Sequence, residues 1–416
     1  MFFLYQILLT LIIFISPIII LIRFLKNKEH KKRFVEKFSF SSKKRSKGKL
    51  IWFHGASVGE LLSIIPLLEK YEKNKSVDQI LITSSTLSSS KILKKFKFKK
   101  TIHQFFPIDH IFFVKKFLGY WKPNLAIFIE SEIWPCMYKE IKVKKIPLIL
   151  LNARITKKTF NKWIKFKKFS QSIFGKIFIA YPQNLETKFF LKKLNINKII
   201  HIGNLKFSEI EDKTLNRISK TLKLHFNKKK IWIASSTHAD EEIFCAKAHI
   251  ELKKQINGLI TIIIPRHIHR VKEIVSKIKK LNLKIAIHSS KNKNLRDVDI
   301  YIVDTFGETK KFHKIGSSVF LGGSIIKRGG QNPLEAARYG AKILHGPNTD
   351  NFTDVYKLLK LFKISKKITT PKELASSITF KKNKNISTKI KNIGRIILKK
   401  TVKELDYLIN NEFKKT

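Results

Sequence analysis

The sequence predicts an α/β protein in which an N-terminal transmembrane anchor helix precedes two Rossmann-like domains of similar length. The first 22 residues contain no charged side chain. Short apolar runs then alternate with longer amphipathic stretches, which is typical of a parallel sheet covered by helices. A charged stretch over residues 208–230 interrupts this alternation once. We therefore expect an anchor over residues 1–25, a first domain over 26–210 and a second domain over 211–416.

Composition narrows the classes of function. The chain has 416 residues, of which 43% are hydrophobic, so it is long and apolar enough for more than one packed core. Lys and Arg number 85 against 30 Asp and Glu, which gives a net charge of +55. Such a charge favours phosphate-bearing partners, either nucleic acid or anionic lipid, without distinguishing them. The two cysteines, Cys136 and Cys245, provide neither a disulfide framework nor a thiolate metal cluster.

The first segment predicts where the chain is located. Residues 1–22 form an apolar helix long enough, at about 1.5 Å per residue, to cross a hydrocarbon layer of about 30 Å. No cation precedes the apolar run and no small-residue cleavage site follows it, which favours an uncleaved anchor over a signal peptide. Six cations between Arg23 and Arg33 follow the run, and flanking cations stay on the cytoplasmic side. Gln6 and Pro17 leave open a helix that lies in the membrane interface instead of spanning it.

The body supplies two series of candidate strands. In an open α/β sheet the ligand crevice lies beyond the carboxyl ends of the strands, so the residues after each run are the candidates for function. The expected strands of the first domain are residues 50–53, 80–83, 125–129, 147–151, 177–180 and 199–202. Those of the second domain are residues 231–234, 260–264, 285–287, 300–303, 319–321 and 343–345.

The first candidate strand runs into the motif HGASVGE, which ends at Glu60. Ser57 and Glu60 have the spacing of a capping box, in which the two side chains satisfy backbone donors at a helix start. A carboxylate beside two glycines at a strand-to-helix turn also suits a general base, because the backbone lets a substrate approach closely. Both roles remain open from the spacing.

The third candidate strand ends in ESEIWP, with Glu130 and Glu132 two residues apart. A carboxylate at a buried strand end needs a partner. A catalytic pair and a pair of first-turn acids favoured by the helix dipole both fit this position. Later loops supply the possible counter-charges Arg154 and Lys206.

The second half contains further strand-end candidates. Residues 237–242 (THADEE) indicate a helix start with Thr237 as its N-cap. Arg266 and His267 follow the strand at 260–264, with His269 and Arg270 close by, and a guanidinium beside an imidazole suits a phosphate or a carboxylate. Residues 304–308 (DTFGE) occupy the equivalent place after the strand at 300–303.

A glycine-rich loop at 322–330 leads to Asn332, Pro333, Leu334 and Glu335. Asn332 can cap a helix, Pro333 fits a first helical position, and free N–H groups at a helix start attract phosphate. Glu335 can accept hydrogen bonds from ribose hydroxyls. A capped helix without a ligand remains the alternative. The chain has neither G-x-G-x-x-G nor a Walker A motif, which argues against a dinucleotide oxidoreductase or a P-loop enzyme.

Eight motifs, taken together and in order, carry a resemblance over nearly the whole chain: HGASVGE, ESEIWP, LNARIT, GNLKF, SSTHADEE, PRHIHR, DTFGE and GGSIIKRGGQNPLEAARYGAKILHGPNTDNF. With these motifs the chain resembles the 3-deoxy-D-manno-octulosonic acid (Kdo) transferases of lipopolysaccharide biosynthesis. The resemblance implies an inverting glycosyltransferase with a B-type fold of two Rossmann-like domains. The N-terminal domain would bind the lipid A precursor (lipid IVA) and the C-terminal domain the donor CMP-Kdo. It also implies that no metal or other cofactor is needed.

The resemblance assigns roles to individual positions. Glu60 matches the general base, and Glu130 and Lys206 match residues that stabilise the transition state. Two positions depart from the family pattern, since Phe306 replaces a usual Met and Gln331 a usual His, so an imidazole contact near the donor is missing. The residues expected at the CMP site are Arg266, His267, Phe306, Gly307, Glu308, Asn332, Pro333, Leu334 and Glu335.

The expected partners are CMP-Kdo, the lipid A precursor and the anionic surface of the bacterial inner membrane, without nucleic acid. The body is expected on the cytoplasmic side, where lysines within 91–100 and 157–168 either dock at anionic lipid or form a solvated basic face. Two alternatives are another B-type glycosyltransferase or epimerase that uses a UDP-sugar, and an anchored basic protein that binds RNA or membranes without catalysis.

Overall fold

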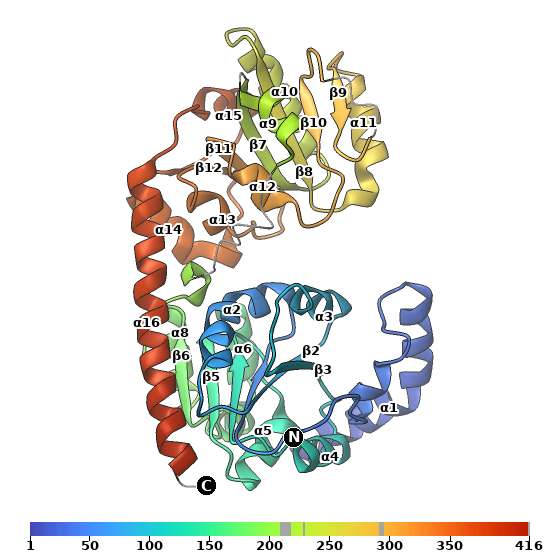
Figure 1. Cartoon of the computed structure of the whole chain (residues 1–416), viewed down its shortest axis with the longest axis vertical. Helices are drawn as coiled ribbons and strands as arrows, with labels where there is room; N and C mark the ends of the chain where they lie inside the picture. Colours follow the sequence, from blue (N-terminus) through green and yellow to red (C-terminus); the bar gives the residue numbers. More distant parts are fainter. Residues whose placement is uncertain (209–217, 228, 291–294, 415–416) are drawn as a thin grey trace. The chain divides into compact units, whose positions relative to one another are not determined.

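The computed structural model describes residues 1–208, 218–227, 229–290 and 295–414 (Figure 1). The chain divides into two compact units. Unit 1 comprises Met1–Ile210 and Gly394–Thr416, and unit 2 comprises Glu211–Ile393.

Unit 1 contains a six-stranded parallel sheet with the order β3-β2-β1-β4-β5-β6. All residues of β1, β2, β4, β5 and β6 are buried, and because successive side chains point to opposite faces, both faces of the sheet are covered. Trp52, Trp121 and Phe128 are fully buried in its core. The strands are β1 (Leu50–His54), β2 (Gln79–Ser84), β3 (Thr101–Phe105), β4 (Leu125–Ile129), β5 (Leu148–Ala153) and β6 (Ile179–Pro182). The helices are α1 (Phe2–Leu25), η1 (Phe34–Phe38), α2 (Val58–Glu72), α3 (Leu87–Leu93), α4 (Ile111–Trp121), α5 (Pro135–Val143), α6 (Lys157–Ile164), α7 (Lys167–Phe174), α8 (Leu185–Lys193) and η2 (Leu205–Ser208).

Unit 2 contains a seven-stranded parallel sheet with the order β13-β12-β11-β7-β8-β10-β9. Trp232, Ile263 and Phe320 are fully buried in its core. The strands are β7 (Lys230–Thr237), β8 (Leu259–Pro265), β9 (Ile285–Ile287), β10 (Ile300–Ile302), β11 (Ser318–Leu321), β12 (Lys342–His345) and β13 (Ser365–Lys367). The helices are α9 (Lys220–Asn227), α10 (Glu241–Lys253), η3 (Ile268–Arg270), α11 (Val271–Lys279), α12 (Thr309–His313), α13 (Leu334–Ala337), η4 (Asp350–Phe352), α14 (Thr353–Leu361), α15 (Pro371–Ser377) and α16 (Lys384–Lys414), which continues into unit 1.

The path of α16 corrects the expected second domain, which was to include everything from 211 to 416. From Gly394 onward this helix packs with unit 1, where Leu405 and Ile409 are fully buried and Tyr181 Oη donates to Glu404 Oε2 at 3.2 Å. The glycine inside the helix has a steric reason, because a Cβ at Gly394 would lie 2.0 Å from the carbonyl oxygen of Phe207.

The two parallel sheets are as predicted, but three strand predictions differ from the structure. Strands β3, whose first three residues are only half-buried, and β13, a short edge strand with two exposed lysines, were not predicted. The expected strand at 199–202 is reduced to a single bridge between Ile199 and Ala180. Both β3 and β13 are partly exposed, so their sequences lack the continuous apolar run that marks a strand buried on both faces.

The N-terminal segment is helical as predicted. Helix α1 is long and apolar enough to span a membrane, by length and composition alone, and its side chains are mostly exposed. A core helix of a soluble protein would be mostly buried, so α1 has an apolar surface that unit 1 leaves uncovered.

Candidate functional site

Glu60 lies at the carboxyl end of β1, in the first turn of α2. Its Oε2 accepts the backbone N–H of Ala56 at 2.7 Å and its Oε1 accepts the hydroxyl of Ser57 at 2.8 Å, while Ser57 Oγ accepts the N–H of Glu60 at 3.3 Å. The capping box predicted from the spacing is therefore present. Gly55 keeps the turn close to the carboxylate, because a Cβ there would lie 3.3 Å from Glu60 Cβ.

The surroundings of Glu60 give it the proton affinity of a base that works near neutral pH. Burial is the largest cause, followed by the negative charges of Glu132 and Glu130, and together these raise its pKa to about 7. The hydrogen bonds from Ser57 and Ala56 act in the opposite direction. A general base is most effective when its pKa lies near the working pH, so the same side chain caps α2 and has the properties of a base.

Glu130 is held in an unusual backbone conformation next to a cation. It follows β4 with a φ of 57°, a region that residues other than glycine rarely adopt. Its Oε1 lies 2.6 Å from Lys206 Nζ, and the two side chains are 8% and 16% exposed. Lys206 belongs to η2, whose start is fixed by the N–H of Leu205 donating to Asn152 Oδ1 at 3.0 Å. Two residues 76 positions apart in the chain thus form the ion pair suggested by the sequence.

Arg154, the other predicted counter-charge, contributes through its backbone. Its N–H donates to the carbonyl of Glu130 at 3.2 Å, and its own carbonyl accepts the hydroxyl of Ser131 at 2.6 Å. Among the ion pairs of the described residues, Glu130 pairs with Lys206 and not with Arg154. Arg154 therefore shapes the turn after β4.

Glu132 is fixed by two ring nitrogens, neither of which was predicted to contact it. His54 Nε2 lies 3.1 Å from Glu132 Oε2, and Trp134 Nε1 donates to the same oxygen at 3.0 Å. His54 is fully buried, stacks on Phe106 and contacts Thr83 Oγ1 at 2.9 Å. Burial lowers the pKa of His54, which favours its neutral form. A polar residue at the end of an otherwise apolar strand was the available signal for His54.

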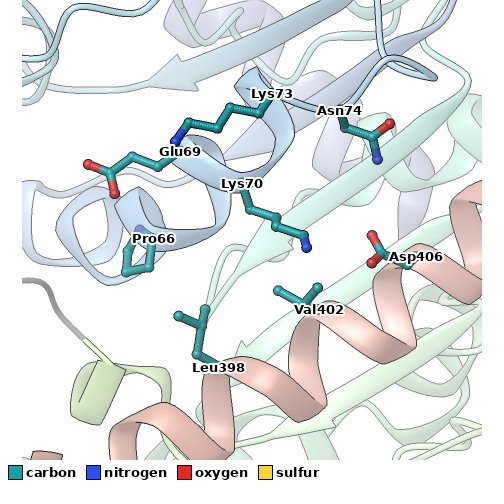
Figure 2. A pocket seen from close by; sticks show the side chains of 8 residues that line it. All are labelled: Pro66, Glu69, Lys70, Lys73, Asn74, Leu398, Val402 and Asp406. Atoms are coloured by element: carbon teal, nitrogen blue, oxygen red, sulfur yellow. The ribbon is translucent and has the colours of Figure 1, made fainter.

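A cavity of about 540 Å³ in unit 1 is separate from these carboxylates (Figure 2). It lies between the later turns of α2 and the part of α16 that belongs to unit 1. In Figure 2 the amine of Lys70 points toward Asp406. None of the predicted site residues lines it; the lining residues are Pro66, Glu69, Lys70, Lys73, Asn74, Leu398, Val402 and Asp406.

In unit 2, Arg266 and His267 follow β8 and are exposed. The N–H of Arg266 donates to the carbonyl of Thr237 at 2.9 Å, which fixes its backbone to the end of β7. The rings of His238 and His267 are 5.6 Å apart. Partial burial and neighbouring cations, Arg266 among them, lower the pKa of His267. This cluster is suited to an anionic ligand.

Arg270 has a structural role instead of the ligand role suggested by its position. Its guanidinium donates to Glu242 at 3.0 Å and to Glu273 at 3.3 Å, so its donors are committed within the unit. The predicted helix start is also one turn off, because Asp240 precedes α10 as its N-cap and Thr237 still belongs to β7.

The loop after β10 holds two residues predicted to bind CMP, of which one is exposed and the other forms ion pairs. Phe306 is 81% exposed, and Gly307 has a φ of 86°. Glu308 pairs with His288 at 3.0 Å and with Lys311 at 2.6 Å. Glu308 is therefore held in place before any ligand arrives.

The glycine-rich loop after β11 is folded around a carboxylate of its own chain. Glu241 accepts the N–H groups of Gly323, Ser324 and Ile325 at 2.7, 3.1 and 3.0 Å. Those donors are therefore occupied, and only the later part of the loop remains for a ligand.

The helix after this loop is shorter than expected. Helix α13 has four residues and begins at Leu334, so it provides little of the dipole that was expected to attract phosphate. Asn332 Oδ1 accepts the N–H of Leu334 at 3.1 Å, Pro333 is buried and Glu335 is half-buried. The four predicted residues 332–335 are contiguous at the carboxyl edge of the sheet.

Comparison with known proteins gives consistent results. Residues 32–209 match the family described as 3-deoxy-D-manno-octulosonic-acid transferase (kdotransferase). The chain is 36% identical to the 3-deoxy-D-manno-octulosonic acid transferase of Rickettsia bellii, over 95% of this chain and 94% of that one. It is 37% identical to the enzyme of the same name from Rickettsia felis, over 82% and 73%.

A solved structure supports the fold. The structure of S. aureus MnaA with UDP aligns with a TM-score of 0.55 at 14% identity, over 87% of this chain and 97% of that one. At that identity the likeness shows the fold alone, the B-type glycosyltransferase fold of two α/β units that each contain a parallel sheet, and nothing about substrate. With the relatives above, it follows that the chain belongs to the 3-deoxy-D-manno-octulosonic acid transferase family and is a glycosyltransferase of lipopolysaccharide biosynthesis.

Proposed function

We propose that this enzyme transfers Kdo from CMP-Kdo to a hydroxyl group of the lipid A precursor, lipid IVA, on the cytoplasmic side of the bacterial inner membrane. The observation that carries the proposal is the state of Glu60, a carboxylate at the end of β1 whose pKa is raised to about 7. Membership of the family supports the choice of sugar.

In the proposed reaction Glu60 accepts the proton of the acceptor hydroxyl. The hydroxyl oxygen forms a bond to the anomeric carbon of Kdo, and the bond from that carbon to the CMP phosphate breaks, with its electron pair leaving on CMP. Attack from the face opposite CMP inverts the anomeric configuration. Positive charge develops on the sugar and negative charge on the phosphate, and fixed charges such as the Glu130–Lys206 pair can stabilise this separation.

We propose that the donor binds to unit 2. Arg266 and His267 are exposed and cationic or polar, which suits the phosphate of CMP. Phe306 offers an exposed ring to an aromatic base. The remaining predicted contacts are Gly307, Glu308, Asn332, Pro333, Leu334 and Glu335, at the carboxyl edge of the same sheet.

We propose further that the reaction needs no divalent metal, because protein cations take the role that a metal has in other transferases. Full activity in EDTA is expected. Loss of activity in EDTA, restored by one added divalent metal, would overturn this part.

The decisive experiment is incubation of the full-length enzyme with CMP-Kdo and lipid IVA, followed by mass spectrometry of the lipid. We expect mass increments of Kdo, and their number gives the residues transferred. UDP-N-acetylglucosamine in place of CMP-Kdo is the matched control. Turnover of the UDP-sugar without turnover of CMP-Kdo would favour the alternative B-type enzyme.

A further inference from the structure

The first turns of α1 are attached to the rest of unit 1 by hydrogen bonds. Tyr5 Oη donates to Asp109 Oδ2 at 2.8 Å, and Asp109, itself 2% exposed, also accepts the backbone N–H groups of Cys136 and Met137 at the start of α5. Thr10 Oγ1 lies 3.3 Å from His110 Nε2. These contacts fix the N-terminal half of α1 to the loop before α4 and to α5.

The other end of α1 is tied to the same unit. Arg23 donates to Glu29 Oε2 at 2.8 Å, and Glu29, 6% exposed, also pairs with Lys37 of η1. The carbonyl of Lys37 accepts the N–H of Ile108 at 2.9 Å, and Arg33 donates to the carbonyl of His103 in β3 at 2.7 Å. The chain that leaves α1 is thereby fixed next to the sheet.

One stripe of α1 faces the protein over the whole length of the helix. Residues 2, 5, 6, 9, 10, 13 and 16, and then 20, 23 and 24, are buried or half-buried, with the spacing of one helical face. Tyr5, Gln6, Thr10 and Ser16 are the side chains between residues 2 and 22 that carry a hydroxyl or amide group, and all lie on this stripe. The opposite face is exposed and apolar, with Phe3 and Phe14 both 77% exposed.

These attachments are incompatible with a helix that crosses a membrane. A helix of 24 residues is about 36 Å long, so spanning would place Tyr5 and Arg23 near opposite surfaces of a hydrocarbon layer about 30 Å thick. Asp109 and His110, which contact the first turns, would then have to leave unit 1 or enter the hydrocarbon. Buried carboxylates do not tolerate that environment.

We propose that α1 lies in the plane of the membrane surface, with its polar stripe on unit 1 and its apolar face in an anionic lipid bilayer. In-plane helices normally present a polar face to water, and here unit 1 takes the place of that water. The charges beside the helix fit this occupant: Lys26, Lys28, Lys31 and Lys32 follow it, and exposed Phe112, Lys115 and Lys116 follow the contact at His110. The inference rests on the membrane association contained in the proposed function, and it replaces the spanning anchor expected from the sequence.

A single substitution tests the docking, because Gln6 Nε2 contacts the sulfur of Cys136. Gln6→Cys in the full-length enzyme, bound to vesicles of phosphatidylethanolamine and phosphatidylglycerol, should resist labelling by a maleimide that partitions into the bilayer, because the rest of unit 1 covers residue 6. Leu8→Cys is the matched control; it lies two residues away on the exposed face and should be labelled by the same reagent. Equal labelling of residues 6 and 8, measured by peptide mass spectrometry, would overturn the proposal.

A second measurement does not depend on the new cysteine. A short hydrophilic tag before Met1 should be cleaved by protease from the same side of sealed vesicles as the catalytic body. Cleavage only from the opposite side would mean that α1 spans the bilayer. Kdo transfer is assayed in the same vesicles, so a spanning helix with active enzyme refutes the in-plane position alone, whereas a docked helix without transfer refutes the proposed function alone.

Discussion

The two predicted sites differ in how far they are assembled before a ligand binds. In unit 1, Glu60, Glu130 and Glu132 each have fixed hydrogen-bond or ion-pair partners within the fold. In unit 2, Arg266 and Phe306 are exposed, and the first donors of the glycine-rich loop are occupied by an internal carboxylate. A base whose pKa must be tuned requires a fixed environment, whereas a nucleotide site can be completed by its ligand.

The largest expected effect concerns Glu60. Glu60→Gln should keep one of the capping hydrogen bonds but cannot accept a proton, so turnover should fall by roughly 10²–10⁴-fold. The measurement is the rate of Kdo transfer at saturating substrate, with thermal unfolding recorded in parallel.

Ser57→Ala is the matched control for capping. It removes the hydroxyl partner of Glu60, costs roughly 1 kcal/mol of stability and leaves the carboxylate in place, so most activity should remain. If the Gln variant stays active while the Ala variant loses stability, Glu60 is a capping residue without a catalytic role.

The ion pair in unit 1 gives the next effect. Lys206→Met should lower turnover by about 10²–10³-fold. It should also destabilise unit 1 by up to about 3 kcal/mol, because Glu130 is left as a buried unpaired charge. The double variant with Glu130→Gln should regain stability but not activity. Lys192→Met, on the exposed surface of α8, should change neither, and recovery of both in the double variant would leave the pair only a structural role.

Two arginines of unit 2, Arg266 and Arg270, test the other side of the comparison. Arg266→Ala should raise the KM for CMP-Kdo by roughly 10–100-fold, the loss of about 1.5–3 kcal/mol expected for a charged hydrogen bond, without lowering the melting temperature. Arg270→Ala should lower the melting temperature and leave the KM for CMP-Kdo unchanged, because Arg270 is paired with Glu242 and Glu273. Equal effects of the two changes on KM would contradict the assignment.

The same contrast explains what the sequence could predict. The central strands and the residues that follow them were predictable, because buried parallel strands give continuous apolar runs and their carboxyl ends meet at one edge. The pairing of Glu130 with Lys206 and the distinction between Arg266 and Arg270 depend on contacts between distant segments. The edge strand β3, the return of α16 to unit 1 and the docking of α1 depend on tertiary packing that local patterns do not encode.

Glu132 should change the pH profile more than the maximal rate. Its negative charge raises the pKa of Glu60, so in the natural enzyme kcat/KM should rise with pH through about 7 as the base loses its proton. Glu132→Gln should lower that pKa and move the acidic limb to lower pH. Trp134→Phe, which removes one hydrogen bond to Glu132 but keeps its charge, should leave the limb in place.

The pH dependence of stability should have the opposite sign to the pH dependence of activity. Because the pKa of Glu60 is raised on folding, its contribution to the free energy of unfolding is present at low pH and lost as pH rises through about 7. Glu132→Gln should weaken this dependence. If Glu132→Gln changes neither the acidic limb of kcat/KM nor the pH dependence of stability, Glu132 does not act on Glu60.

The smallest expected effect concerns Gln331, the position at which the resemblance to the family implies a usual His. The backbone carbonyl of Gln331 accepts the hydroxyl of Tyr356 at 3.2 Å, a contact that exchange of the side chain leaves in place, so the loop should not be disturbed. Gln331→His should tighten binding of CMP-Kdo a few-fold below about pH 6.5, where the imidazole is charged, and leave it unchanged at pH 8. Isothermal titration calorimetry at the two pH values measures this. The expectation is that a nucleotide site completed by its ligand gains affinity from one more cation. An equal affinity at both pH values would indicate that the phosphate of CMP-Kdo lies away from this loop. Arg266 alone would then support the contrast between the fixed site of unit 1 and the ligand-completed site of unit 2.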